Sequence, residues 1–108
     1  MTVNTKTIKW TGKSGNKYQY WIYSLDVTFS AEPGNYVFAQ ETKPGSWKPI
    51  YIGETSDLSE RFDSHHKASC IQRHGVTTIH VQKNSATDDD SRNEESDLIS
   101  HWNPTCNG

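Results

Sequence analysis

The chain has 108 residues, of which 31% are hydrophobic and 22% charged, with a formal net charge of −2 at pH 7. This length predicts one domain with a modest core, and four Trp and five Tyr predict that the core uses few, large side chains. We find no apolar run long enough for a membrane span and no signal peptide, so we expect no membrane association and a cytoplasmic or nucleoid-associated protein.

Two further features of composition bear on the setting of the protein. Cys70 and Cys106 are too few for a disulfide framework, so we expect free thiols in a reducing compartment. The negative net charge gives no support for tight non-specific nucleic-acid binding, but a chain with this net charge can still have a local basic face. Cationic and imidazole side chains crowd the middle of the chain, at Lys43, Lys48, Arg61, His65, His66, Lys67, Arg73 and His74.

The first 32 residues predict a β-hairpin. Residues 7–11 alternate polar and apolar, residues 17–23 are aromatic and β-rich, and residues 12–16 have the composition of a turn. The aromatic side chains favour cross-strand pairs that hold the hairpin on a sheet, and the alternative is a base-stacking platform. These side chains are Trp10, Tyr18, Tyr20, Trp21 and Tyr23.

Two antiparallel strands are predicted next, at residues 35–40 and from Trp47 or Lys48 to Gly53. The Pro-Gly pair within residues 41–46 indicates a loop between them. Strand alternation predicts Ile50 and Ile52 on one face and Tyr51 on the other.

A helix is predicted from Asp57, a good N-cap that Glu60 completes as a capping box. Its expected end is about His66, with Arg73 as the alternative, before Gly75 breaks it. Along it, residues four apart form two neighbouring stripes. The apolar stripe is Leu58 and Phe62, and the polar one is Arg61 and His65.

The end of the chain predicts a third central strand at residues 76–82 and a last helix from near Ser91. Leu98, Ile99 and Trp102 form the apolar face of that helix. Glu95 lies on the same face, and a carboxylate on a core-facing stripe marks a candidate functional site. The fold class is therefore α+β in one domain, residues 1–108: a small, mostly antiparallel sheet of three central strands plus an N-terminal hairpin extension, flanked by helices.

Several of these short patterns, in this order, resemble the GIY-YIG nuclease family. Gly34-Asn35-Tyr36 stands for the first tripeptide, with Asn35 in place of Ile, and Tyr51-Ile52-Gly53 matches the second literally. The spacing between them is longer than usual, and the resemblance covers residues 34–107. The remaining elements of the pattern are met by Arg61, His65, Glu95, Leu98, Ile99, Pro104 and Asn107.

The resemblance implies a metal-dependent endonuclease that hydrolyses DNA phosphodiester bonds. It implies that Glu95 holds one divalent cation, Mg²⁺ or Mn²⁺, and that Arg61 binds phosphate through its planar guanidinium. It also implies a tyrosine general base, for which Tyr36 and Tyr51 are both candidates, with a slight preference for Tyr51.

Two more residues receive roles from the resemblance. His65 is expected to relay the proton or bind phosphate, and Asn107 to hydrogen-bond the metal shell or the tyrosine. The small size and the acidic total favour an alternative of another class, a non-catalytic module of the same fold that binds nucleic acid or another protein. His66, His74, His80 and His101 carry no motif, so we expect them to be surface or satisfied histidines.

Overall fold

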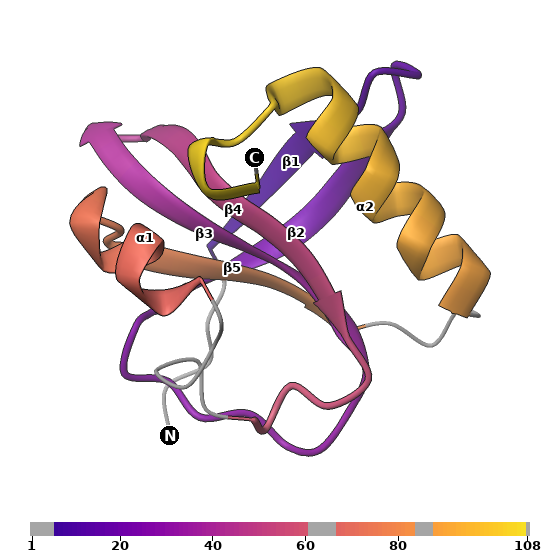
Figure 1. The fold of residues 1–108 in the computed structure, drawn as a ribbon, viewed down its shortest axis with the longest axis horizontal. Coiled ribbons are helices and arrows are strands. Elements are labelled where there is room, and N and C mark those ends of the chain that lie inside the picture. Colours follow the sequence, from indigo (N-terminus) through magenta and orange to yellow (C-terminus); the bar gives the residue numbers. More distant parts are fainter. Residues whose placement is uncertain (1–5, 61–66, 84–87, 108) are drawn as a thin grey trace.

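The computed structural model describes residues 6–60, 67–83 and 88–107. The elements form one layered unit, a sheet with helices packed on it (Figure 1). In chain order they are β1 (Thr7–Thr11), β2 (Lys17–Ser24), β3 (Gly34–Lys43), β4 (Ser46–Thr55), α1 (Ala68–Arg73), β5 (Thr78–Lys83), α2 (Asp88–Trp102) and the 3-10 turn η2 (Thr105–Asn107).

All five strands belong to one sheet with the order β1-β2-β5-β3-β4, and every neighbouring pair is antiparallel. The predicted α+β class is confirmed. The N-terminal hairpin is joined to the three central strands through the pairing of β2 with β5. Within the described ranges, no helix has the length and apolarity needed to cross a membrane.

The sheet has a hydrophobic cluster on each face, because alternate residues of β3 point to opposite sides. α1 and η2 cover one face, where the buried residues are Tyr36, Phe38, Ile50, Leu58, Ile71, Ile79, Val81 and Cys106. α2 covers the other (Figure 1), where they are Trp10, Tyr20, Val37, Ala39, Ile52 and Leu98.

The N-terminal hairpin packs on α2 through its aromatic residues. Trp10 and Tyr20 are buried, and the Trp102 ring packs edge-on against Trp10 while its Nε1 donates to the Thr11 carbonyl at 2.9 Å. Asp97 of α2 accepts hydrogen bonds from the Ser14 and Tyr18 hydroxyls and the Ser14 N–H. Trp10, Tyr18 and Tyr20 therefore hold the hairpin on the molecule, as the packing interpretation expects.

His80 of β5 is a satisfied interior histidine, as predicted. It is fully buried, Trp10 Nε1 donates to its Nδ1 at 3.1 Å, and Thr78 Oγ1 lies 3.1 Å from its Nε2. Burial lowers the pKa of His80 to about 4, because an imidazolium would lose its hydration there. This histidine contributes to packing in the neutral form.

The loop of the hairpin formed by β3 and β4 differs from the prediction. The loop expected at residues 41–46 is shorter, because β3 continues to Lys43, β4 starts at Ser46, and only Pro44 and Gly45 make the turn. Gly45 has φ 82°, a conformation that glycine adopts without strain. This extension of the two strands accounts for the long spacing between Tyr36 and Tyr51.

A β-bulge at Ile50 corrects the predicted faces of β4. Phe38 pairs with Tyr51 and Ala39 with Pro49, so Ile50 is the extra residue. Ile50 consequently packs on the α1 face with Tyr51, while Ile52 packs on the α2 face. The prediction that Ile50 and Ile52 share a face is wrong, because strict alternation fails across a bulge.

The predicted starts of both helices also need correction. Residues 57–60 form a turn, in which the Asp57 carboxylate accepts a hydrogen bond from the Ser59 N–H at 2.8 Å. Residues 61–66 of the predicted helix lie outside the described residues, and the described helix α1 begins at Ala68. The last helix already includes Asp88, which precedes the predicted start near Ser91.

The cysteines are bonded to each other, which contradicts the expected free thiols. Cys70 of α1 and Cys106 of η2 form a disulfide with their Cα atoms 5.8 Å apart, a separation that a disulfide spans. They lie 36 residues apart in sequence, and only the packing of η2 against α1 brings them together. Their spacing in the sequence therefore carried no signal of the pairing.

Candidate active site

The two tyrosines of the tripeptides meet above Gly53. Tyr36 of β3 is the register partner of Gly53 in β4, and the rings of Tyr36 and Tyr51 lie 6.1 Å apart between centroids with planes tilted by 30°. A Cβ on Gly53 would stand 2.6 Å from the Tyr36 hydroxyl oxygen and 2.9 Å from Cε2 of Tyr51. Glycine is required here because the phenol groups occupy the space of a side chain.

The hydroxyls of these tyrosines are coupled by a hydrogen bond but are not equivalent. Burial and the neighbouring Tyr51 raise the pKa of Tyr36 far above its ordinary value. Burial also raises the pKa of Tyr51, and Glu95 adds to the rise, but a hydrogen bond from Tyr36 opposes it. Because Tyr51 is half-buried and receives that hydrogen bond, its phenolate is the easier of the two to form.

Glu95 of α2 is the carboxylate of this group. It is half-buried, and burial raises the pKa of Glu95, as its place on an apolar helix face predicts. The charge of Glu54 on β4 raises the pKa further, while a backbone hydrogen bond from Glu54 and the charge of Arg92 lower it. Glu95 also contributes to the raised pKa values of both tyrosines.

The donors gathered here suit a hard divalent cation. The charge of Glu95 acts on the pKa of both tyrosines, and the charge of Glu54 acts on the pKa of Tyr36 and of Glu95. Oxygen is the ligand that Mg²⁺ and Mn²⁺ prefer. Burial is the main cause of the raised pKa of Glu95 and the charge of Glu54 is the next, and a bound cation would oppose both by favouring the ionised form. Sequence reasoning did not single out Glu54, although its place directly after Gly53 at the end of a strand was the available signal.

Asn35 fixes the position of α2 relative to this group. It is fully buried, and its Nδ2 donates to the Ser91 carbonyl at 3.0 Å. Ser91 precedes Glu95 by four residues, so the two lie on the same side of α2. The residue that departs from the tripeptide pattern therefore anchors the helix turn that precedes Glu95.

Asn107 lies beside the site and contacts its backbone. Its Oδ1 accepts from the Ile52 N–H, and its Nδ2 donates to the Ile52 carbonyl, both at 2.8 Å. Ile52 stands between Tyr51 and Gly53, so Asn107 holds the strand segment that carries the tyrosine. The structure brings together Tyr36, Tyr51, Glu95 and the strand bound by Asn107, while Arg61 and His65 lie outside the described residues.

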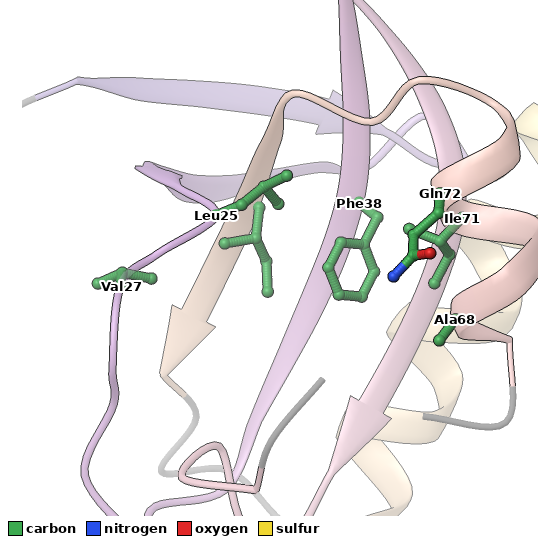
Figure 2. Close-up of a pocket in the computed structure, with 7 residues that line it drawn as sticks. Leu25, Val27, Phe38, Ala68, Ile71 and Gln72 are labelled. Atoms are coloured by element: carbon green, nitrogen blue, oxygen red, sulfur yellow. The ribbon is translucent and has the colours of Figure 1, made fainter. Parts of the chain in front are cut away.

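An apolar pocket of about 240 Å³ lies apart from this group (Figure 2). It opens between α1 and the segment after β2 and shares Phe38 with the α1-face cluster. Among the described residues that line it, Gln72 is the one with a polar side chain. The lining residues are Leu25, Val27, Phe38, Ala68, Ile71, Gln72 and Ile79.

Comparison with solved structures assigns the fold. The chain superposes on three Tyr-to-Phe point mutants of the GIY-YIG N-terminal endonuclease domain of UvrC from Thermotoga maritima, each bound to its catalytic divalent cation. The TM-score is 0.58 for each, with 24%, 23% and 23% sequence identity over 73% of this chain and 86% of theirs. The fold is therefore GIY-YIG-like. No protein-family model and no curated protein matches the chain.

Proposed function

We propose that this protein is a metal-dependent endonuclease that hydrolyses DNA phosphodiester bonds at the group formed by Tyr36, Tyr51 and Glu95. One observation carries the proposal: the rings of Tyr36 and Tyr51 lie 6.1 Å apart over Gly53, and the half-buried Glu95 carboxylate raises the pKa of both. A packing role alone does not require two phenols to meet over a glycine within reach of a carboxylate charge.

In this proposal Tyr51 is the general base. Its phenolate accepts a proton from the attacking water, and Tyr36 donates a hydrogen bond to the Tyr51 oxygen that stabilises the phenolate. The burial of Tyr36 keeps its own proton in place, so it remains a donor through the reaction. The two tyrosines thus have different roles, although they come from similar tripeptides.

The residues present fit a divalent cation, which Glu95 would hold with Glu54 nearby. The cation, Mg²⁺ or Mn²⁺, supplies charge neutralisation at the phosphate and at the leaving oxygen. The solved neighbours support a divalent ion, since each is bound to its catalytic divalent cation.

The remaining motif residues complete the proposal. Arg61 would bind the phosphate through two parallel N–H groups, and His65 would carry the proton onward or contact phosphate. Asn107 acts through the backbone of β4, where its two hydrogen bonds to Ile52 fix the direction of the Tyr51 side chain. It is a positioning residue rather than a ligand.

The test is a cleavage assay on a panel of DNA substrates. Purified protein is incubated with supercoiled, branched and single-stranded DNA, with Mg²⁺, with Mn²⁺ and with chelator. We expect nicks or breaks that require the divalent ion. Absence of cleavage on every substrate at high protein concentration, together with retained DNA binding, would instead support the non-catalytic module.

A further inference from the structure

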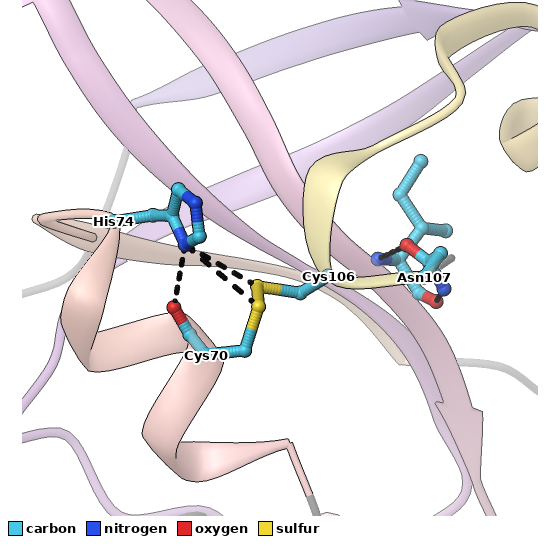
Figure 3. The surroundings of a disulfide bond; sticks show 5 residues. Cys70, His74, Cys106 and Asn107 are labelled. Carbon is cyan, nitrogen blue, oxygen red and sulfur yellow. Dashed lines mark hydrogen bonds between the residues drawn. A yellow bond between two sulfur atoms is a disulfide. The ribbon is translucent and has the colours of Figure 1, made fainter.

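The disulfide has a third polar neighbour of metal-ligating type. His74 follows Cys70 by one helical turn on α1, and Cys106 reaches the same point from η2 (Figure 3). The His74 Nδ1 lies 3.7 Å from the Cys70 sulfur and 3.8 Å from the Cys106 sulfur. All three ligand atoms lie within 4.8 Å of one another.

These separations match a tetrahedral zinc site in all but one distance. Zinc bonds of about 2.3 Å to sulfur and 2.0–2.1 Å to nitrogen place neighbouring ligands about 3.6 Å apart for sulfur and nitrogen, and about 3.8 Å for two sulfurs. The two nitrogen–sulfur distances already agree with the first value. The sulfurs alone must separate, and rotation of the Cys70 and Cys106 side chains can achieve this once the bond between them is reduced.

The imidazole is free to turn its Nδ1 towards a metal at little cost. In the oxidised form Nδ1 hydrogen-bonds with the Cys70 carbonyl at 2.8 Å. The same carbonyl also accepts the backbone N–H of His74 at 3.2 Å. Loss of the imidazole contact therefore leaves no orphaned carbonyl, and the ring proton moves to Nε2.

We propose that the reduced protein binds Zn²⁺ through Cys70, His74 and Cys106, with water as the fourth ligand. A dithiol reductant supplies two electrons and two protons, breaks the sulfur–sulfur bond and becomes a disulfide itself. Zn²⁺ then displaces the two thiol protons and binds both thiolates. Soft thiolate ligands favour zinc, which separates this site from the oxygen donors around Glu95.

The two states of this site have the same structural effect. The disulfide and the zinc ion each join α1 to η2, and η2 carries Asn107, which holds Ile52 of β4. The protein therefore keeps its C-terminal turn in place in oxidising and in reducing surroundings. This inference does not depend on the proposed nuclease function, because it concerns a different set of ligands.

The test uses Co²⁺ as a spectroscopic substitute for Zn²⁺. Protein reduced with a phosphine, without oxygen, is titrated with Co²⁺ while thiolate-to-cobalt charge-transfer and tetrahedral ligand-field bands are recorded. We expect one Co²⁺ per reduced chain, displacement by Zn²⁺, and no such bands for the oxidised protein. His74→Ala, which can still form the disulfide, should bind at least about tenfold more weakly after reduction.

Two control variants locate the bound ion. His101→Ala removes an exposed histidine of α2 and should bind Co²⁺ as wild type does, and Glu95→Ala should keep the thiolate bands. Absence of these bands in the reduced wild type, or equal affinity in His74→Ala, would overturn the proposal. If reduction unfolds the metal-free chain, recovery of its circular dichroism on addition of Zn²⁺ supports the site, and failure to recover also overturns it.

Discussion

Two adjacent glutamates on α2 differ in the groups that surround their carboxylates. Glu94 and Glu95 are both half-buried, and burial is the main cause of the raised pKa of each. Glu94 accepts a hydrogen bond from the Tyr20 hydroxyl at 2.6 Å, and Tyr20 is fully buried. Glu95 instead has the charge of a second carboxylate, Glu54, as the next cause of its raised pKa.

The difference separates a structural carboxylate from a candidate catalytic one. The Tyr20 hydroxyl gives the Glu94 carboxylate a hydrogen-bond donor within the protein, so this carboxylate needs no cation as a partner. Around Glu95, the neighbouring Glu54 makes the ionised form less favourable, and a cation would reverse that effect. Local conflicts of this kind are expected where a sequence is arranged for function rather than stability. The same substitution at each position therefore tests whether the two glutamates have different roles.

The largest expected effect is on cleavage by Glu95→Ala. Removal of the proposed cation ligand should reduce metal-dependent cleavage to the level seen with chelator, because the neighbouring Glu54 carboxylate on β4 does not replace a ligand on α2. Glu94→Ala is the matched control, and we expect it to retain cleavage under conditions where it is folded. Comparable losses in both variants, measured by plasmid nicking, would remove the distinction between the two glutamates.

The second prediction concerns the tyrosines. Tyr51→Phe should lower the cleavage rate by about 10²–10⁴ with little change in stability, as expected for loss of a general base. Since the pKa of Tyr51 is raised, the phenolate fraction and hence the wild-type rate should increase with pH through the neutral and mildly alkaline range. Tyr18→Phe removes a hydroxyl bonded to Asp97 far from the site and is the control. A fully active Tyr51→Phe would transfer the base to Tyr36 or His65.

The third prediction concerns Arg61, which the sequence motif alone supports. Arg61→Ala should reduce cleavage by about 10²–10³ without unfolding the protein. Arg61→Lys should also be poor, because lysine keeps the charge but cannot present two parallel donors to phosphate. Arg73→Lys, on α1, serves as the control. Turnover at the wild-type level in Arg61→Lys would show that charge alone matters at this position.

The fourth prediction concerns stability, for which substitution of Glu94 should have a larger effect than substitution of Glu95. In chelator, Glu94→Ala should lower the free energy of unfolding by about 1–3 kcal/mol, because the buried Tyr20 hydroxyl loses its partner. Glu95→Ala should leave the free energy of unfolding unchanged or higher, since a costly charge is removed. Chemical denaturation of both variants measures this directly. A marked loss of stability in Glu95→Ala, with cleavage retained, would contradict the metal-site interpretation.

The smallest expected effect is the stabilisation of the folded protein by Mg²⁺. A ligand that binds only the native state at ten times its dissociation constant adds about 1.4 kcal/mol to the free energy of unfolding. Wild type and Glu94→Ala should both show a higher melting temperature with Mg²⁺ than with chelator, and Glu95→Ala should not. An equal rise in Glu95→Ala would place the ion elsewhere.

The strands and the face of Glu95 could be predicted because their signals are local. Turn residues mark both hairpins, and helical spacing puts Glu95 beside Leu98 on the inward face of α2. The predicted helix start at Asp57 was wrong because the same carboxylate that caps a helix can close a turn through Ser59. The faces of β4 were wrong because the bulge at Ile50 leaves no mark in the residue pattern.

What the sequence did not reveal depends on contacts between distant elements. The disulfide of Cys70 and Cys106, and the approach of His74 to it, follow from the packing of η2 on α1. The influence of Glu54 on Glu95 requires β4 and α2 to lie side by side. Periodicity identifies the face on which a residue lies, but it does not identify the residue opposite.

The hydrogen bonds of the C-terminal residues also bear on self-association. β1 and β4 are the outer strands of the sheet, and an outer strand with free N–H and C=O groups can pair with another copy of the chain. Asn107 occupies both backbone groups of Ile52 on β4, and the Trp102 indole occupies the Thr11 carbonyl on β1. Residues near the C-terminus thereby occupy pairing groups of one residue on each outer strand, which makes addition of another strand at those positions less favourable.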